Sequence, residues 1–151
     1  MGYNSRTTDS HIAFKVADAL AMFEILKGIA LKTDPKILEY YEITRTEVKC
    51  DENTQKTIDL LEALVPHGFN GDIIDGKVRM AVCDSQWKRD DGDHEKEQAV
   101  WKALAPYINN GSHIECEDDD GNFRWYFNNG KLYFQTGNDW PEPTQEEEVT
   151  A

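Results

Sequence analysis

The first hydrophobic pattern along the chain is a short alternation. Ile12, Phe14 and Val16 alternate with polar or small residues, which predicts a half-buried strand over residues 11–16. After this strand the apolar residues recur every three or four positions, as they do along one side of a helix. Because the apolar stripe is broad, we expect the helix to be well covered; its members are Leu20, Met22, Phe23, Ile25, Leu26, Ile29 and Ala30.

The next segment predicts a short helix followed by a strand. Asp34 can cap free helical amides, and Pro35 is tolerated at the first helical position, so we expect a helix that ends near Tyr41. The run over residues 43–50 is rich in β-branched side chains and predicts a strand.

A helix and a hairpin are predicted in the middle of the chain. Residues 55–65 carry apolar side chains at helical spacing, and Pro66 is expected to end this helix. Asp75-Gly76 lies between two alternating runs and supplies the positive φ angles that a tight hairpin turn requires. Residues 72–83 are therefore predicted to form a β-hairpin.

A polar loop precedes the next predicted helix. Asp93 is the last residue of this loop and is expected to cap the helix. Val100 and Leu104 give the helix an apolar side, and Pro106 is expected to close it.

The clearest pattern is a three-stranded antiparallel meander over residues 112–137. Asp120-Gly121 and Asn129-Gly130 separate its three alternating runs, and two-residue loops at both turns would fix the register. The predicted opposite pairs on an apolar face are Cys116 with Trp125, Ile114 with Phe127, Phe127 with Leu132, and Trp125 with Phe134. On the other face they are Glu117 with Arg124, Glu115 with Tyr126, and Tyr126 with Tyr133.

These elements predict an α+β fold: an antiparallel sheet that ends in the meander, with helices packed mainly on one face. The 151 residues suffice for one domain with a full hydrophobic core. We expect this domain to span residues 1–137. Pro141, Pro143 and the acidic run of residues 146–148 predict a disordered tail over residues 138–151.

The charge of the chain changes the functional expectation. Its formal net charge is −13, and residues 84–151, with six basic and sixteen acidic side chains, contribute most of it. Direct binding to nucleic acid is disfavoured, because Lys and Arg supply most of its affinity by neutralising phosphates. A surface charged only for solubility is the alternative explanation.

The cysteines and the lack of a recognisable targeting signal predict a cytoplasmic protein. Cys50, Cys83 and Cys116 are odd in number and widely spaced, so we expect buried, reduced thiols. No apolar run is long enough to cross a membrane, and the amino terminus lacks a signal-peptide pattern.

No motif for a catalytic, metal or cofactor site stands in the sequence. None of the four histidines lies in a zinc-binding spacing, and the acidic run before Gly121 fails the calcium-loop pattern. We therefore predict no metal and no cofactor. An enzyme, such as a small hydrolase, that uses dispersed Asp, Glu and His side chains stays open as an alternative.

The candidate binding residues are acidic side chains of the second half and one aromatic group of the meander. Tyr and Arg are favoured anchors of interfaces, although a helix could cover that face of the sheet. The candidates are Asp90, Asp91, Asp93, Glu95, Glu97, Glu117, Asp118, Asp119 and Asp120, together with Arg124, Tyr126 and Tyr133.

The two ends of the chain and several residues of its second half resemble a known group of sequences. The chain begins Met-Gly-Tyr-Asn-Ser-Arg and later contains Trp87, Gly111, Arg124-Trp125 and Trp140-Pro141. With these residues it resembles a family of small uncharacterised proteins from actinobacteria and bacteriophages that begin Met-Gly-Tyr-x-Ser. The resemblance implies a phage or mobile-element setting and transfers no site residue.

The expected function is that of a non-enzymatic acidic binding protein. Its partner would be a basic, nucleic-acid-handling host or defence protein, which it would inhibit. A phage structural accessory protein is a further alternative. A continuous acidic face would favour the binding protein, whereas a cleft with converging carboxylates would favour an enzyme.

Overall fold

The structure is a computed structural model that describes residues 3–40, 50–82, 86–89, 92–119, 121–137 and 140–150. Its described strands form one antiparallel sheet in the order β2-β3-β1-β5-β6-β7, and β4 also pairs with β1. The strands are β1 (Tyr3–Lys15), β2 (Phe69–Ile74), β3 (Lys77–Val82), β4 (Gln86–Arg89), β5 (His113–Asp118), β6 (Phe123–Asn128) and β7 (Lys131–Thr136).

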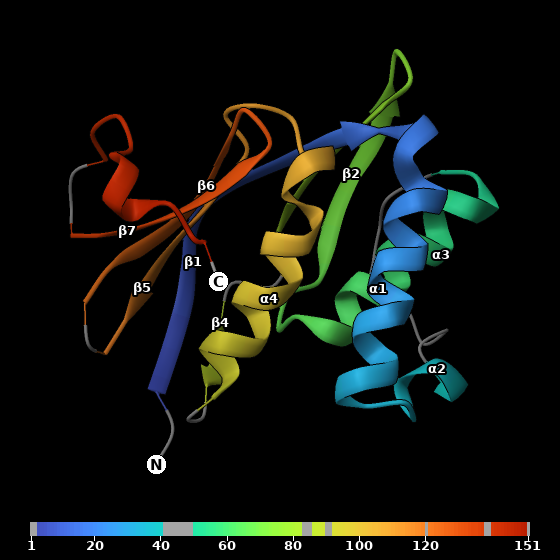
Figure 1. Ribbon diagram of the computed structural model, residues 1–151, viewed down its shortest axis with the longest axis horizontal. Helices are drawn as coiled ribbons and strands as arrows, with labels where there is room; N and C mark the ends of the chain where they lie inside the picture. Colours follow the sequence, from blue (N-terminus) through green and yellow to red (C-terminus); the bar gives the residue numbers. More distant parts are fainter. Residues whose placement is uncertain are drawn as a thin grey trace.

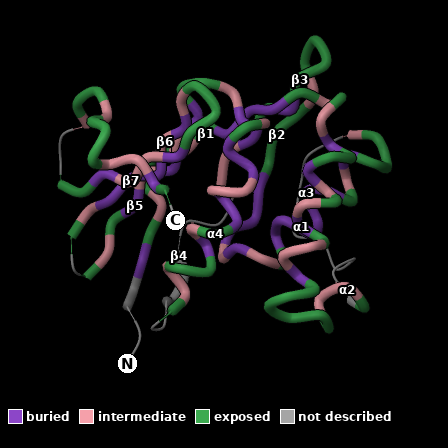
Figure 2. The backbone as a smooth tube through the Cα atoms, viewed as in Figure 1, coloured by how far each residue is buried: buried purple, intermediate pink, exposed green. Residues whose placement is uncertain are grey.

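The helices lie mainly on one face of this sheet (Figure 1), so the predicted α+β fold is confirmed. They are α1 (Ala19–Thr33), α2 (Ile37–Tyr40), α3 (Glu52–Leu64) and α4 (Asp93–Leu104), with short 3₁₀ turns η1 (Val16–Asp18), η2 (Ala105–Tyr107) and η3 (Gln145–Glu147). In Figure 2 the buried positions lie in the interior, whereas the exposed ones lie at the turns and the outer side of the helices. The largest fully buried side chains include Trp101, Trp125, Phe14, Phe69 and Phe127.

The central strand β1 is longer than the sequence predicted. The alternation of residues 11–16 indicated only its second half, but the strand begins at Tyr3. Residues 3–10 are mostly polar, so no alternation of apolar side chains predicts a strand there. Their extended conformation comes instead from backbone pairing with β4 on one side and β5 on the other.

The β2–β3 hairpin is confirmed, with Ile74 opposite Lys77. Asp75 and Gly76 have φ angles of 52° and 74°, as a primed two-residue turn requires. Val78 and Met80 are buried on the helix side, in line with the predicted alternation.

One of the two meander registers is confirmed and the other is wrong by two residues. In β6–β7, Trp125 lies opposite Phe134 and Tyr126 opposite Tyr133, as predicted. In β5–β6 the turn is centred one position earlier than predicted, with the backbone N–H of Gly121 donating to the carbonyl of Asp118, so every pair shifts by two residues. Ile114 lies opposite Trp125, Cys116 opposite Phe123, Glu115 opposite Arg124 and His113 opposite Tyr126. Because side chains alternate with period two, a shift of two residues leaves both faces as predicted.

The helices follow the predicted segments with two local differences. On α1, Leu20 is exposed, and the buried positions are Ala19, Met22, Leu26 and Ala30. At α4 the cap is Gly92 and not Asp93, and no side chain caps this end. The strand predicted over residues 43–50 falls almost entirely outside the described residues.

The end of the chain differs from the expected solvated tail. The backbone N–H of Val149 donates to the carbonyl of Leu132 at 2.8 Å, and the Val149 side chain is buried. Gln135 on β7 donates through Nε2 to the carbonyl of Pro141. Residues 140–150 therefore lie along β7 as part of the domain.

Two smaller predictions concern the thiols and the membrane. Cys116 is buried and Cys50 is half-buried, whereas Cys83 lies outside the described residues. Within the described ranges, no helix has the length and apolar character that crossing a membrane requires.

Candidate functional site

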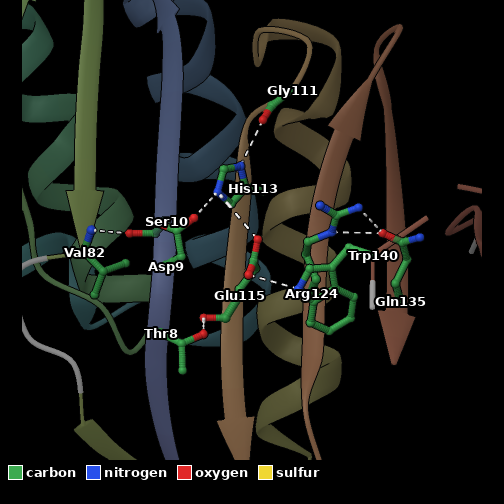
Figure 3. Close-up of polar contacts among 10 residues, drawn as sticks. All are labelled: Thr8, Asp9, Ser10, Val82, Gly111, His113, Glu115, Arg124, Gln135 and Trp140. Atoms are coloured by element: carbon green, nitrogen blue, oxygen red, sulfur yellow. Dashed lines mark hydrogen bonds and ion pairs between the residues drawn. The ribbon is translucent and has the colours of Figure 1, made fainter. Parts of the chain in front are cut away.

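The open face of the sheet, opposite the helices, carries the most distinctive group of side chains (Figure 3). Strand pairing arranges them in two rows across neighbouring strands, because directly opposite residues point to the same side. One row consists of His11, His113, Tyr126 and Tyr133, and the other of Asp9, Glu115, Arg124 and Gln135. These eight residues make up the open face; Arg124 and Gln135 are buried, in contact with Trp140 and Pro141, and the other six are exposed or half-buried.

Arg124 is held in place on the open face by its neighbours. Its Nε donates to Oε1 of Gln135 at 2.9 Å, and the Nη2 atom donates to the same oxygen. The guanidinium also lies 4.4 Å from the ring centre of Tyr126 and 5.4 Å from that of Trp140. Such cation–π contacts orient both rings around the charge.

Burial lowers the pKa of Arg124, while the negative charge of Glu115 acts in the opposite direction. The side chain stays charged, because arginine titrates far above neutral pH. Tyr126 and Tyr133 lie side by side and half-exposed, next to this charge. Glu148 of the carboxyl-terminal segment pairs with Tyr133 along β7.

A second group on the open face was missed by sequence reasoning. His113 Nε2 lies 3.0 Å from Oδ2 of Asp9 and 3.9 Å from Oε2 of Glu115. Asp9 and His113 are 104 positions apart in the chain, so no spacing motif can reveal them. The only sequence signal is the alternation that places His113 and Glu115 on the same side of β5.

The predicted acidic residues divide between the two faces of the sheet. Glu117 is exposed on the open side and pairs with Arg6 at 2.7 Å. Asp118 lies on the helix side and accepts a hydrogen bond from the Ser5 hydroxyl. Asp119 is exposed in the turn. A single continuous acidic face is therefore not formed by these three side chains.

The start of α4 nevertheless lies at the same end of the sheet as the β5–β6 turn. The ring of His94 packs 6.2 Å from that of Phe123, the first residue of β6. Asp93 and Glu95 precede and follow this histidine in the first turn of α4. Together with Asp118 and Asp119 of the β5–β6 turn, we call these residues the acidic end of the sheet. Asp90, Asp91 and Asp120 lie outside the described residues.

Glu97, one of the candidate binding residues, is buried. Its carboxylate is buried and accepts hydrogen bonds at Oε2 from His67 at 2.9 Å and from the Trp101 indole at 3.0 Å. Burial by itself would raise the pKa of Glu97, but the charge and hydrogen bond of His67, with the Trp101 bond, lower it overall. Glu97 therefore holds α4 to the segment before β2 and is not available to a partner.

An open hollow of about 460 Å³ lies at the other end of β1, between the start of α1 and the β6–β7 turn. It is polar and includes Lys15, Asp18, Lys77, Asn109 and Asn110 in its lining. None of the candidate binding residues that the structure describes belongs to its lining.

Comparison with models of protein families, with curated proteins and with solved structures finds no match to this chain.

Proposed function

We propose that this protein is a non-enzymatic binding protein that engages a Lys- and Arg-rich surface of a partner protein through its open face. The observation that carries the proposal is the half-exposed pair of Tyr126 and Tyr133 beside the fixed guanidinium of Arg124. Tyr and Arg in rigid, partly desolvated positions are the residues that most often anchor interfaces.

The charges around the open face favour a basic partner. Asp9 and Glu115 lie on the face, Glu117 follows on the same strand, and the acidic end of the sheet adjoins it. With a net charge of −13, the protein repels other acidic surfaces and attracts basic ones over long range. Inhibition of a nucleic-acid-handling host or defence protein in the bacterial cytoplasm is the specific form of this proposal.

An enzyme is less well supported than a binding protein. Catalysis on a small substrate needs a concave site where reactive groups converge. The open hollow lined by Lys15, Asp18 and Asn109 lies away from the clustered carboxylates. The open face is instead a pleated surface, which suits contact with another macromolecule.

The double substitution of Tyr126 and Tyr133 by Ala is expected to abolish capture of the partner. The protein would be immobilised, exposed to bacterial lysate and eluted with rising salt, with wild type and variant compared by mass spectrometry. The control is Leu20→Ala, which removes an exposed apolar side chain from α1, on the other side of the sheet. Proteins retained by wild type and control but not by the double variant support the proposal. An identical set on all three would contradict it.

Substituting Asp118, Asp119 and Asp120 together by Asn is expected to slow association with the captured partner several-fold. Charges near an interface steer the encounter more than they hold the complex, and salt screens them within about 8 Å at physiological ionic strength. Stability should hardly change, because Asn can still accept the hydrogen bond that Ser5 donates to Asp118.

The matched control for this triple variant carries Glu24→Gln, Glu39→Gln and Asp72→Asn. These side chains are exposed outside the acidic end, and the control has the same net charge as the test variant. Stopped-flow association rates would be measured across a salt series. Equal rates for wild type and test variant at low salt would rule out electrostatic steering by the acidic end.

A further inference from the structure

A change of register in β1 brings two carboxylates together on the open face. Thr7 lies opposite Cys116, but the next paired residue is Asp9, opposite Glu115, so Thr8 is an extra residue in β1. Such bulges re-aim side chains, and they are frequent next to functional sites. If the register of residues 5–7 continued, Thr8 and not Asp9 would face Glu115. The Thr8 hydroxyl instead donates to the backbone carbonyl of Glu115, which holds the bulge.

His113 points its second ring nitrogen at these carboxylates. Its Nδ1 lies 3.0 Å from the backbone carbonyl of Gly111, which can only accept, so Nδ1 carries the proton. Nε2 then faces Oδ2 of Asp9 at 3.0 Å and Oε2 of Glu115 at 3.9 Å. One ligand atom from each of the three residues lies within 4.8 Å of the other two.

Glu115 is oriented by a bond to its other oxygen. The indole Nε1 of Trp140 donates to Oε1 at 3.0 Å, which leaves Oε2 directed at His113. Arg124, although opposite Glu115, donates to Gln135 rather than to this carboxylate. Figure 3 shows the arrangement, with His113 between Asp9 and Glu115 and the Trp140 bond on the far side of Glu115. Outer hydrogen bonds of this kind fix the ligands of metal sites.

We propose that Asp9, His113 and Glu115 bind one divalent transition-metal ion of the Zn²⁺ type. Imidazole nitrogen with carboxylate oxygen is a donor set that suits Zn²⁺, and a backbone carbonyl on the far ring nitrogen is typical of histidine ligands. A cation would also neutralise the two carboxylates that the bulge sets against each other. The three side chains fill three positions of a tetrahedral site.

The fourth position is open to water or to a partner's side chain. By strand register, His11 lies opposite His113 on the same face and is exposed. Its ring is not among the three groups whose ligand atoms lie within 4.8 Å of one another, so it would have to turn toward the ion to become the fourth ligand. The site lies beside Tyr126 in the open face, so a bound ion would add a positive charge at the edge of that surface.

The test uses untagged full-length protein, stripped of metal with chelator and titrated with zinc sulfate in a calorimeter. We expect one Zn²⁺ per chain for wild type, with affinity weakened by at least about tenfold in both His113→Ala and Asp9→Asn. The controls are Asp72→Asn, an exposed carboxylate on β2, and Cys50→Ser, a half-buried thiol; both should bind Zn²⁺ like wild type. His11→Ala tells whether that ring contributes the fourth ligand.

A second readout does not depend on affinity. In heteronuclear NMR spectra, Zn²⁺ should first shift the resonances of the His113 ring and of Gly111, before those of His67 or His94. Circular dichroism and thermal unfolding show whether each variant is folded. No Zn²⁺ binding by wild type at millimolar concentration, or equal binding by folded His113→Ala, would overturn the proposal. Partner capture plays no part in this test, so its failure is distinct from failure of the proposed function.

Discussion

Replacing Trp125 by alanine is expected to lower the free energy of unfolding by about 3 to 5 kcal/mol, as for other large aromatic side chains removed from a core. The Trp125 ring is fully buried on the helix side of β6. It stacks on His94 at 5.0 Å between ring centres and contacts Phe134 at 4.8 Å. The cavity left behind could not collapse without moving α4, because His94 belongs to the first turn of that helix.

The neighbouring variant Tyr126→Ala is the control for this prediction. Tyr126 projects to the open face and is partly exposed to solvent. Its removal therefore leaves no closed cavity and should lower the free energy of unfolding clearly less. Urea unfolding of the two variants, with equal slopes in denaturant, gives the comparison. Equal losses would contradict the assignment of one apolar and one open face to β6.

Replacing Glu97 by alanine is expected to lower the free energy of unfolding by a similar amount, about 3 to 5 kcal/mol, because it leaves the buried His67 without its charged partner. The Trp101 indole would lose its acceptor at the same time. The control is Glu95→Ala, two positions earlier on α4 and exposed, which should change stability by no more than about 0.5 kcal/mol. A small effect at Glu97 would show that the His67–Glu97 contact does not hold α4 in place.

The same pair predicts a dependence of stability on pH. Burial alone would raise the pKa of Glu97, but His67, Trp101 and the charge of His94 lower it below the ordinary glutamate value. A carboxyl with a lowered pKa stabilises the fold above the unfolded-state pKa of about 4.3, and this stabilisation is lost as pH falls through the folded-state pKa. Below about pH 4.3, wild type should therefore lose stability more steeply than Glu97→Gln. Parallel losses in thermal unfolding would contradict the lowered pKa.

Local chemistry in the sequence was enough for the hairpins. Asp75-Gly76 and Asn129-Gly130 adopt positive φ angles, and each joins strands in the predicted register. Such turns depend on a few adjacent residues, because only Gly, Asn and Asp enter that region of φ easily. The alternation of apolar residues then fixed which face of each strand is buried.

The first meander turn shows where local chemistry no longer decides. Asp120-Gly121 carries the same signal as the other turns, yet the turn between β5 and β6 is centred one position earlier, where the Gly121 N–H donates to the Asp118 carbonyl. The edge of β5 that faces away from β6 pairs with β1, and there Ser5 donates a hydrogen bond to Asp118 and Arg6 donates one to Glu117. These bonds come from residues more than a hundred positions away, and a local pattern does not contain them.

The sequence by itself therefore determined the α+β class, the three-stranded meander and the two faces of its strands, because period and turn chemistry are short-range properties. Only the tertiary structure decided that Glu97 is buried against His67 and that Asp9 meets His113. The spacing of apolar residues does not reveal that a charged residue is buried. The pairing of β1 with β5 joins segments that lie far apart in the sequence. Whether an acidic side chain is solvated, paired in the core or set beside a histidine depends on which strands and helices become neighbours.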